Sequence, residues 1–142
     1  MATNPPSHPR HIDWASLRAH ALDAADAAYS PYSGFAVGAA ALIDDGRVVV
    51  GANIENASYG LTLCAETVMV AAHRMSGGGR IVAVAVVGNG APTTPCGRCR
   101  QVIWEFGGPD CLIDVNGTPM SLGDLLPHAF PDASTFRKEP GR

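Results

Sequence analysis

The chain has 142 residues, of which 46% are hydrophobic, and it carries a formal net charge of −3. This length predicts one domain with enough apolar residues for a core. The acidic balance, without a basic run, argues against a protein that binds nucleic acid or membrane surfaces nonspecifically. The longest apolar run, 81–87, is too short to span a bilayer, and the first residues lack the apolar core of a signal peptide. We therefore expect a cytoplasmic protein.

The first half of the chain predicts a helix followed by a hairpin. Asp13 is a suitable N-cap for a helix over 14–29. Two apolar runs, 35–43 and 48–53, flank the tetrapeptide DDGR, which favours a tight turn between two antiparallel strands.

The second half alternates helices with strands. A helix is expected to begin near Cys64 and to end at the glycines of 76–79. The unbroken apolar run 81–88 is typical of a central strand covered on both faces. A third helix over 97–109 and two short strands after it complete the order αββαβαββ.

This order predicts an α/β fold, namely a three-layer α/β/α sandwich around a five-stranded mixed sheet. We expect 1–142 to form this single domain, with loose termini at 1–12 and 133–142.

Three cysteines and one glutamate stand at two predicted helix starts. Cys64 and Glu66 lie two residues apart, and Cys96 and Cys99 form a C-x-x-C motif. Helix N-termini favour thiolates because of the helix dipole and the free N–H groups, so three thiolates from two helices can converge on one ion. Three protein ligands leave the fourth tetrahedral position of Zn²⁺ open to water, as in catalytic sites. Glu66 would exchange protons with that water.

Simpler interpretations of these motifs remain open. The C-x-x-C pair alone could be a thioredoxin-like redox pair, and Cys64 could be an ordinary buried cysteine. A closed structural zinc module would need a fourth ligand, and His73 falls more than two helical turns beyond Cys64. Cys111 has no partner motif and is interpreted as a core residue.

Taken together, the motifs resemble those of small, homotetrameric, zinc-dependent cytidine deaminases with three cysteine ligands. The resemblance covers about residues 14–130 and rests on the stretches YSPYSGFAVGAAAL, GANIENASYG, CAE, PCGRCRQV and LLPHAF. It implies a cytidine deaminase-like fold and hydrolysis of cytidine and 2′-deoxycytidine to uridine and 2′-deoxyuridine, with release of ammonia, in pyrimidine salvage. Zinc-bound hydroxide would attack the ring, with Glu66 as the proton shuttle. The alternative is deamination of another aminopyrimidine compound such as blasticidin S.

The resemblance also implies roles for individual residues. Cys64, Cys96 and Cys99 would bind one zinc ion per chain. Asn53 and Glu55 would bind the ribose hydroxyls, and Phe35 would pack beside the sugar and the base. The Ala65 N–H would face the pyrimidine carbonyl, and the Thr94 carbonyl would face the leaving amino group. The residues expected to reach a neighbouring subunit's site are Ala57, Tyr59 and Phe130, with Phe130 stacking on the base. The partner would be a small nucleoside, with neither nucleic acid nor membrane involved.

One position departs from the family pattern, which usually has arginine directly after C-A-E. This chain has Thr67 there. Three thiolates and Zn²⁺ sum to −1, so nearby positive charge matters. Arg98 and Arg100 are the local candidates, but they point about 200° apart on a helix. At most one can donate directly to a thiolate, and Arg100 is favoured because it follows Cys99.

Overall fold

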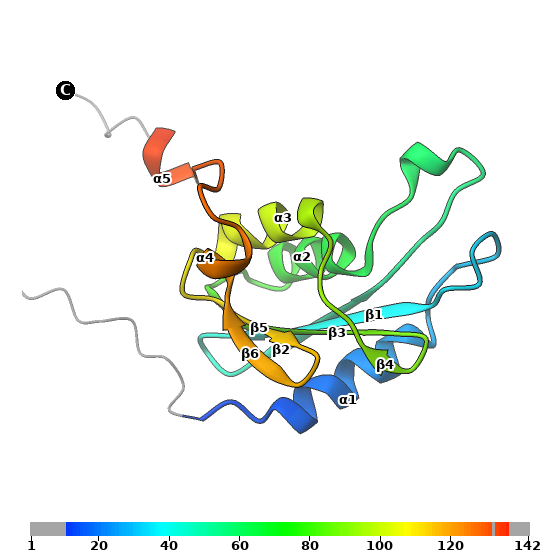
Figure 1. Ribbon diagram of the computed structural model, residues 1–142, viewed down its shortest axis with the longest axis horizontal. Coiled ribbons are helices and arrows are strands. Elements are labelled where there is room, and N and C mark those ends of the chain that lie inside the picture. The colour runs from blue at the N-terminus through cyan, green and yellow to red at the C-terminus, as the bar shows by residue number, and fades with distance from the viewer. Residues whose placement is uncertain (1–10, 132, 137–142) are drawn as a thin grey trace, which may run out of the picture.

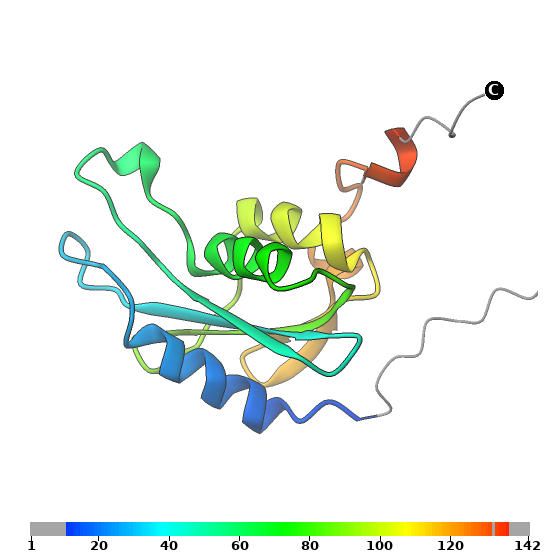
Figure 2. The same ribbon diagram turned by 180° about the vertical axis from the view of Figure 1, so that it is seen from behind.

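The computed structural model describes residues 11–131 and 133–136, and its helices lie on both faces of one mixed sheet (Figures 1 and 2). The strands are β1 (Val37–Ile43), β2 (Val48–Ala52), β3 (Ile81–Gly88), β4 (Ala91–Pro92), β5 (Leu112–Val115) and β6 (Thr118–Ser121). Their order is β2-β1-β3-β5-β6, with β4 paired to β3. The pairing of β3 with β5 is parallel, and the other pairings among these strands are antiparallel. The predicted mixed sheet is confirmed, and β4 is an additional short strand.

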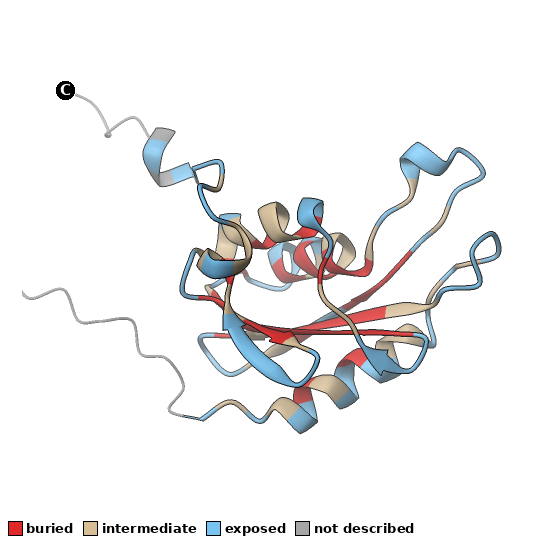
Figure 3. Ribbon diagram, in the orientation of Figure 1, coloured by how far each residue is buried: buried red, intermediate tan, exposed pale blue. Residues whose placement is uncertain are grey.

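Three helices, α1 (Trp14–Ala25), α2 (Ala65–Met75) and α3 (Gly97–Gly107), make the two outer layers. The other helical segments are the short α4 (Leu122–Leu125) and α5 (Ala133–Phe136) and a 3₁₀ turn η1 (Tyr59–Leu61). Helix α1 covers one face of the sheet, whereas α2 and α3 cover the other. Every residue of β3 is buried between these layers (Figure 3), which confirms the predicted central strand. No helix within the described ranges is long and apolar enough to cross a membrane.

The predicted first helix begins as expected but ends early. The Asp13 carboxylate accepts a hydrogen bond from the Ser16 N–H at 2.9 Å, so the N-cap is confirmed. The helix ends at Ala25 instead of residue 29 because the backbone of Tyr29 pairs elsewhere. Its N–H donates to the Asn53 carbonyl at 2.9 Å and its carbonyl accepts from the Glu55 N–H at 2.8 Å. These bonds join two chain segments that project together from one end of the sheet (Figure 1).

The predicted β1–β2 hairpin is confirmed, and its turn also holds the end of α2. The Arg47 side chain donates to the carbonyl oxygens of Ser76 at 2.5 Å and Gly78 at 2.6 Å. A cation at a helix C-terminus satisfies carbonyls that have no partner within the helix. Of the expected loose termini, residues 1–10 and 137–142 lie outside the described residues, and 133–136 form α5.

Candidate functional site

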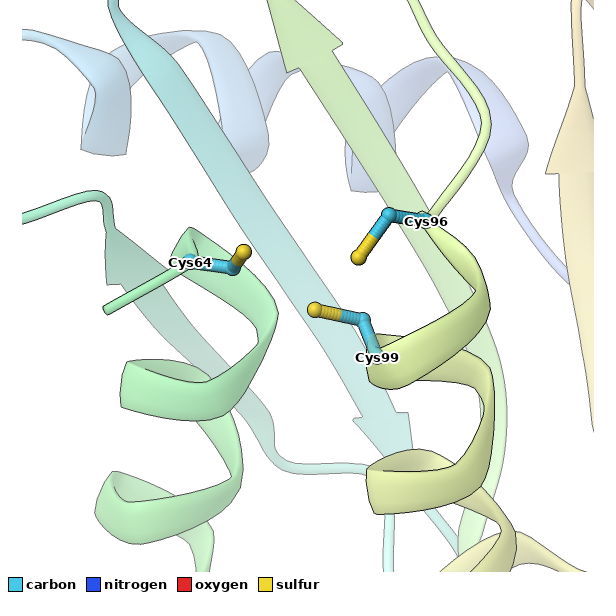
Figure 4. Close-up of side chains that lie close together, drawn as sticks. All are labelled: Cys64, Cys96 and Cys99. Carbon is cyan, nitrogen blue, oxygen red and sulfur yellow. The ribbon is translucent and has the colours of Figure 1, made fainter. Parts of the chain in front are cut away.

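Two helices begin side by side and bring three thiols together. Cys64 is the N-cap of α2, Cys96 is the N-cap of α3, and Cys99 lies in the first turn of α3. Their sulfur atoms all lie within 4.8 Å of one another and point toward a common centre (Figure 4). The predicted convergence of the three cysteines is therefore present in the fold.

The chemistry of this cluster suits a zinc ion. Thiolates bind zinc with a Zn–S distance of about 2.3 Å, which places tetrahedral sulfur ligands about 3.8 Å apart. A small adjustment of the observed sulfur positions reaches that spacing. His73, weighed above as a fourth ligand, is buried away from the cluster, with Nε2 2.7 Å from the Gly79 carbonyl oxygen. Within the described chain the cluster thus offers three ligands and leaves one tetrahedral position open.

The expectation that helix N-termini would lower the pKa values of all three thiols is wrong for two of them. Burial, the largest cause, raises the pKa of Cys64 and of Cys99, and the nearby Glu66 charge raises both further. Burial also favours a higher pKa at Cys96, but hydrogen bonds from the Cys99 backbone and from the other two thiols lower this pKa overall. Desolvation outweighs the helix dipole here, because it disfavours the charged thiolate directly. Zinc binding must therefore displace protons from at least two of the thiols.

Glu66 lies beside the cluster in the first turn of α2 and is 5% exposed. Burial raises the pKa of its carboxyl group. A carboxyl group with a raised pKa holds a proton more readily than an exposed one and can pass it on, which is the property that a general acid–base group needs.

A cavity of roughly 200 Å³, open to solvent, adjoins these groups. It is lined by Phe35, Val37, Asn53, Thr62, Leu63, Cys64, Ala65, Glu66, Thr93, Thr94 and Cys96. Seven of the residues singled out from the sequence therefore meet in one hollow. Val37, Thr62, Leu63 and Thr93 also line it, and no local sequence signal marks them, because they come from the ends of neighbouring strands and loops.

Asn53 is held by the backbone of the chain just before and within β1. Its Oδ1 accepts from the Val37 N–H at 2.9 Å, and its Nδ2 donates to the Phe35 carbonyl at 2.9 Å. A side-chain amide has two donor hydrogens and two acceptor lone pairs. One donor and one acceptor position therefore remain for a ligand in the cavity.

Glu55 lies in an adjoining hollow lined also by Tyr32, Ser33, Tyr59 and Thr62, and Thr62 borders both cavities. Its carboxylate accepts bonds from the Tyr32 and Ser33 N–H groups, each at 3.0 Å, and from the Ser33 hydroxyl. Hydrogen bonds from the side chain and backbone of Ser33 lower the pKa of Glu55, so the carboxylate is favoured. Sequence reasoning missed Ser33, although the polar stretch before Phe35 was a visible signal.

The three residues expected to reach a neighbouring subunit's site also lie outside the thiol-lined cavity. Ala57 and Tyr59 belong to the projecting segment, whose exposure Figure 3 shows, and Tyr59 is 72% exposed. Phe130 is 68% exposed, and the Gln101 side chain holds its backbone through bonds of 3.1 and 3.2 Å. Gln101, one helical turn after Gly97, is a further residue that the sequence did not single out.

The two candidate arginines are placed differently from the expectation. Arg100 donates from Nε to the Pro95 carbonyl at 2.9 Å and from Nη1 to the Leu125 carbonyl at 2.8 Å, and Arg98 is exposed. Thr67, in contrast, contacts a thiol: its Oγ1 lies 4.0 Å from Cys99 Sγ. The three-residue spacing from Cys64 places Thr67 on the same side of α2, so this contact was visible in the helical periodicity.

Comparison with known proteins gives a consistent picture. A family model described as the cytidine and deoxycytidylate deaminase zinc-binding region matches residues 14–114. A cytidine deaminase of Mycobacterium tuberculosis is 61% identical over 120 residues, which cover 84% of this chain and 90% of the relative. A cytidine deaminase of Halalkalibacterium halodurans is 43% identical over 125 residues, which cover 84% of this chain and 95% of the relative.

The fold is matched as well. The crystal structure of a cytidine deaminase from Mycobacterium tuberculosis superposes with a TM-score of 0.83 at 59% identity, and the match covers 85% of this chain and 99% of that one.

Proposed function

Because this chain belongs to the family of zinc-binding cytidine and deoxycytidylate deaminases, we propose that its thiol-lined cavity is the site where a nucleoside is deaminated. The chain is a zinc-dependent hydrolytic enzyme that converts cytidine to uridine with release of ammonia. We extend this activity to 2′-deoxycytidine. The observation that carries the proposal is the meeting of three thiols and the buried Glu66 in one cavity.

Cys64, Cys96 and Cys99 are the residues that would hold the zinc ion, one per chain. When bound, zinc lowers the pKa of a water molecule to about 7 and so supplies a nucleophile at neutral pH.

Glu66 moves the protons of the reaction. It accepts a proton from the attacking water and gives it to N3 of the cytosine ring, which makes C4 more electrophilic. It then takes the proton of the hydroxyl group added at C4 and delivers it to the amino nitrogen, so that the C4–N bond breaks, the C4 carbonyl forms and ammonia leaves. The raised pKa of Glu66 supports this role, because the carboxyl group must be able to hold each proton between transfers.

The substrate is oriented by the walls of the two cavities. Asn53 and Glu55 bind the ribose hydroxyls, and the capacity left at Asn53 and the ionised state of Glu55 support this. Phe35 packs beside sugar and base. The Ala65 N–H, at the start of α2 where no intrahelical carbonyl is available, donates to the pyrimidine carbonyl. The Thr94 carbonyl accepts from the departing amino group.

We further propose a homotetramer in which Ala57, Tyr59 and Phe130 complete the site of a neighbouring subunit. Their position outside the thiol-lined cavity and the exposure of the two aromatic side chains support this arrangement. Exposed aromatic groups of this size are typical of protein–protein contacts. We also propose that 1–142 is a single domain, that it acts in the cytoplasm in pyrimidine salvage, and that it binds neither nucleic acid nor membranes.

Ultraviolet monitoring of cytidine, 2′-deoxycytidine, cytosine and blasticidin S, with a zinc count per chain, tests the proposed function. We expect turnover of both nucleosides, little turnover of free cytosine, and one zinc per chain. Turnover of blasticidin S without turnover of cytidine would contradict the proposal and favour the other aminopyrimidine deaminase activity.

A further inference from the structure

The ring of Phe35, which forms one wall of the candidate active-site cavity, rests on a glycine. Gly88 is the last residue of β3 and is buried. A methyl group added at Gly88 would lie 2.6 Å from Cζ and 2.7 Å from Cε1 of Phe35. The aromatic ring therefore fills the space that any side chain at position 88 would need.

The backbone around Phe35 is held from several sides. The Phe35 N–H donates to the Ser33 hydroxyl oxygen at 2.9 Å, and its carbonyl accepts from Asn53 Nδ2 at 2.9 Å. The next residue, Ala36, donates to Asn89 Oδ1 at 3.1 Å and accepts from the Asn89 N–H at 2.9 Å. With its backbone fixed, Phe35 can yield only by rotation about its side-chain bonds.

Such a rotation would alter the cavity without reaching the groups that do the chemistry. The ring can turn into the cavity or further into solvent, to which Phe35 is already 44% exposed. In either case the wall facing the substrate changes. Cys64 and Glu66 stand at the start of α2, and neither is among the three nearest atoms that a methyl group at Gly88 would meet, which belong to Phe35 and, at 3.3 Å, to Thr93.

We propose that Gly88 is a positioning residue for substrate binding, because the missing side chain at this strand end sets where the Phe35 ring lies and so how wide the nucleoside cavity is. This inference rests on the proposed role of Phe35 beside the sugar and base. Gly88 touches no reacting group, so a substitution at this position should change KM and not kcat.

The experiment is a double-mutant cycle on the zinc-loaded enzyme. Gly88→Ala should raise KM for cytidine at least about fivefold, with kcat and zinc content within about twofold of the parent enzyme. Phe35→Leu removes the ring atoms that the new methyl would meet, so the double variant Gly88→Ala/Phe35→Leu should have the KM of Phe35→Leu alone. Val87→Ala is the matched control, since Val87 packs on the α1 side of the same strand. It should lower thermal stability without raising KM.

The outcomes separate this inference from the proposed function. An equal rise in KM from Gly88→Ala with and without Phe35→Leu overturns the inference. If Phe35→Leu raises KM and Gly88→Ala does not, the inference alone fails. If Phe35→Leu leaves KM unchanged, the proposed role of Phe35 fails and the inference fails with it. Should Gly88→Ala not fold, recovery of folded protein in the double variant supports the contact, and failure of both variants to fold overturns it.

Discussion

A neutral hydroxyl lies close to the buried thiol of the three-cysteine cluster. Thr67 Oγ1 lies 4.0 Å from Cys99 Sγ, and Arg100 donates to two backbone carbonyls instead. A hydroxyl that donates to a thiolate stabilises its charge, and loss of a group that supports a metal ligand typically lowers metal affinity 10- to 100-fold. We predict that Thr67→Val loses zinc to a chelator about 10-fold faster or more, whereas Thr67→Ser stays near the parent rate.

Arg98→Gln is the matched control, because Arg98 is exposed and should not change zinc retention. If Arg98→Gln or Arg100→Gln releases zinc faster and Thr67→Val does not, an arginine balances the thiolates, as the sequence suggested, and the Thr67 contact has no such role.

The ionised state of Glu55 depends on Ser33. Hydrogen bonds from Ser33 lower the pKa of Glu55. Glu55 is therefore ionised above that lowered pKa and becomes protonated as the pH falls through it. Ser33→Ala removes one of these donors and moves the pKa back up toward its ordinary value. We therefore predict that the rise in KM for cytidine on acidification begins at a higher pH in Ser33→Ala than in the parent enzyme.

Measurement of KM against pH for both proteins, with Ser16→Ala on α1 as a control, checks this prediction. Superimposable acid limbs for the parent enzyme and Ser33→Ala would show that Glu55 does not carry the ribose contact in its charged form.

At the residue scale, the sequence predicted the groups whose chemistry is fixed by local spacing. Cys64, Cys96 and Cys99 were singled out because the combined spacing of C-x-E and P-C-x-x-C resembles that of zinc-dependent deaminases. The partners of Asn53 and Arg100 could not be predicted, because both side chains bind backbone atoms far from them in sequence. The thiol pKa directions were also missed, since burial cannot be read from neighbours in the chain.

At the scale of elements, close packing of α2 on β2 sets the position of the zinc site. A methyl group at Gly51 would collide with backbone atoms of Met69 and Ala65 in α2. Because backbone atoms cannot rotate aside, α2 would have to move, and it carries Cys64 and Glu66 at its start. We predict that Gly51→Ala destabilises the metal-free protein by ~1–3 kcal/mol in urea unfolding and weakens zinc retention.

Gly38 offers a matched control on the other face of the sheet. It lies on β1, and a methyl group there would collide with backbone atoms of Ala21 and Ala25 in α1. Gly38→Ala should destabilise the protein comparably while leaving zinc retention unchanged. Equal loss of zinc from both variants would mean that general unfolding, and not displacement of α2, releases the metal.

Most elements were predictable because their apolar periodicity and end signals agree. The buried run of β3 and the glycines after α2 illustrate this agreement. The early end of α1 and the short strand β4 were missed. The early end of α1 depends on backbone pairing with residues distant in sequence, as at Tyr29 with Asn53, which local propensity does not encode. The strand β4 has only two residues, which pair with the end of β3 just before them, and so short a strand leaves no periodic pattern in the sequence.

At the scale of the whole molecule, the proposed sharing of sites between subunits predicts complementation. Phe130→Ala and Glu66→Gln should each be impaired alone. If Phe130 serves a neighbour's site, a random 1:1 co-assembly combines an intact Glu66 with an intact Phe130 in about a quarter of the sites. The mixed assembly should then turn over cytidine faster than the two separate variants together.

Co-expression with two affinity tags, followed by a rate measurement on the doubly purified assembly, tests this prediction. A rate equal to the mean of the two separate variants would place Phe130 in the site of its own chain.

The central claim is that Glu66 carries protons in a zinc-dependent deamination, and one measurement tests it most directly. Glu66→Gln and the parent enzyme are compared by the loss of cytidine absorbance, at equal zinc content and equal thermal stability. General acid–base groups contribute a factor of ~10²–10⁴, and this one serves several transfers, so the account predicts a residual rate of about 1% or less. A variant that binds zinc normally and keeps more than about a tenth of the parent rate would contradict it.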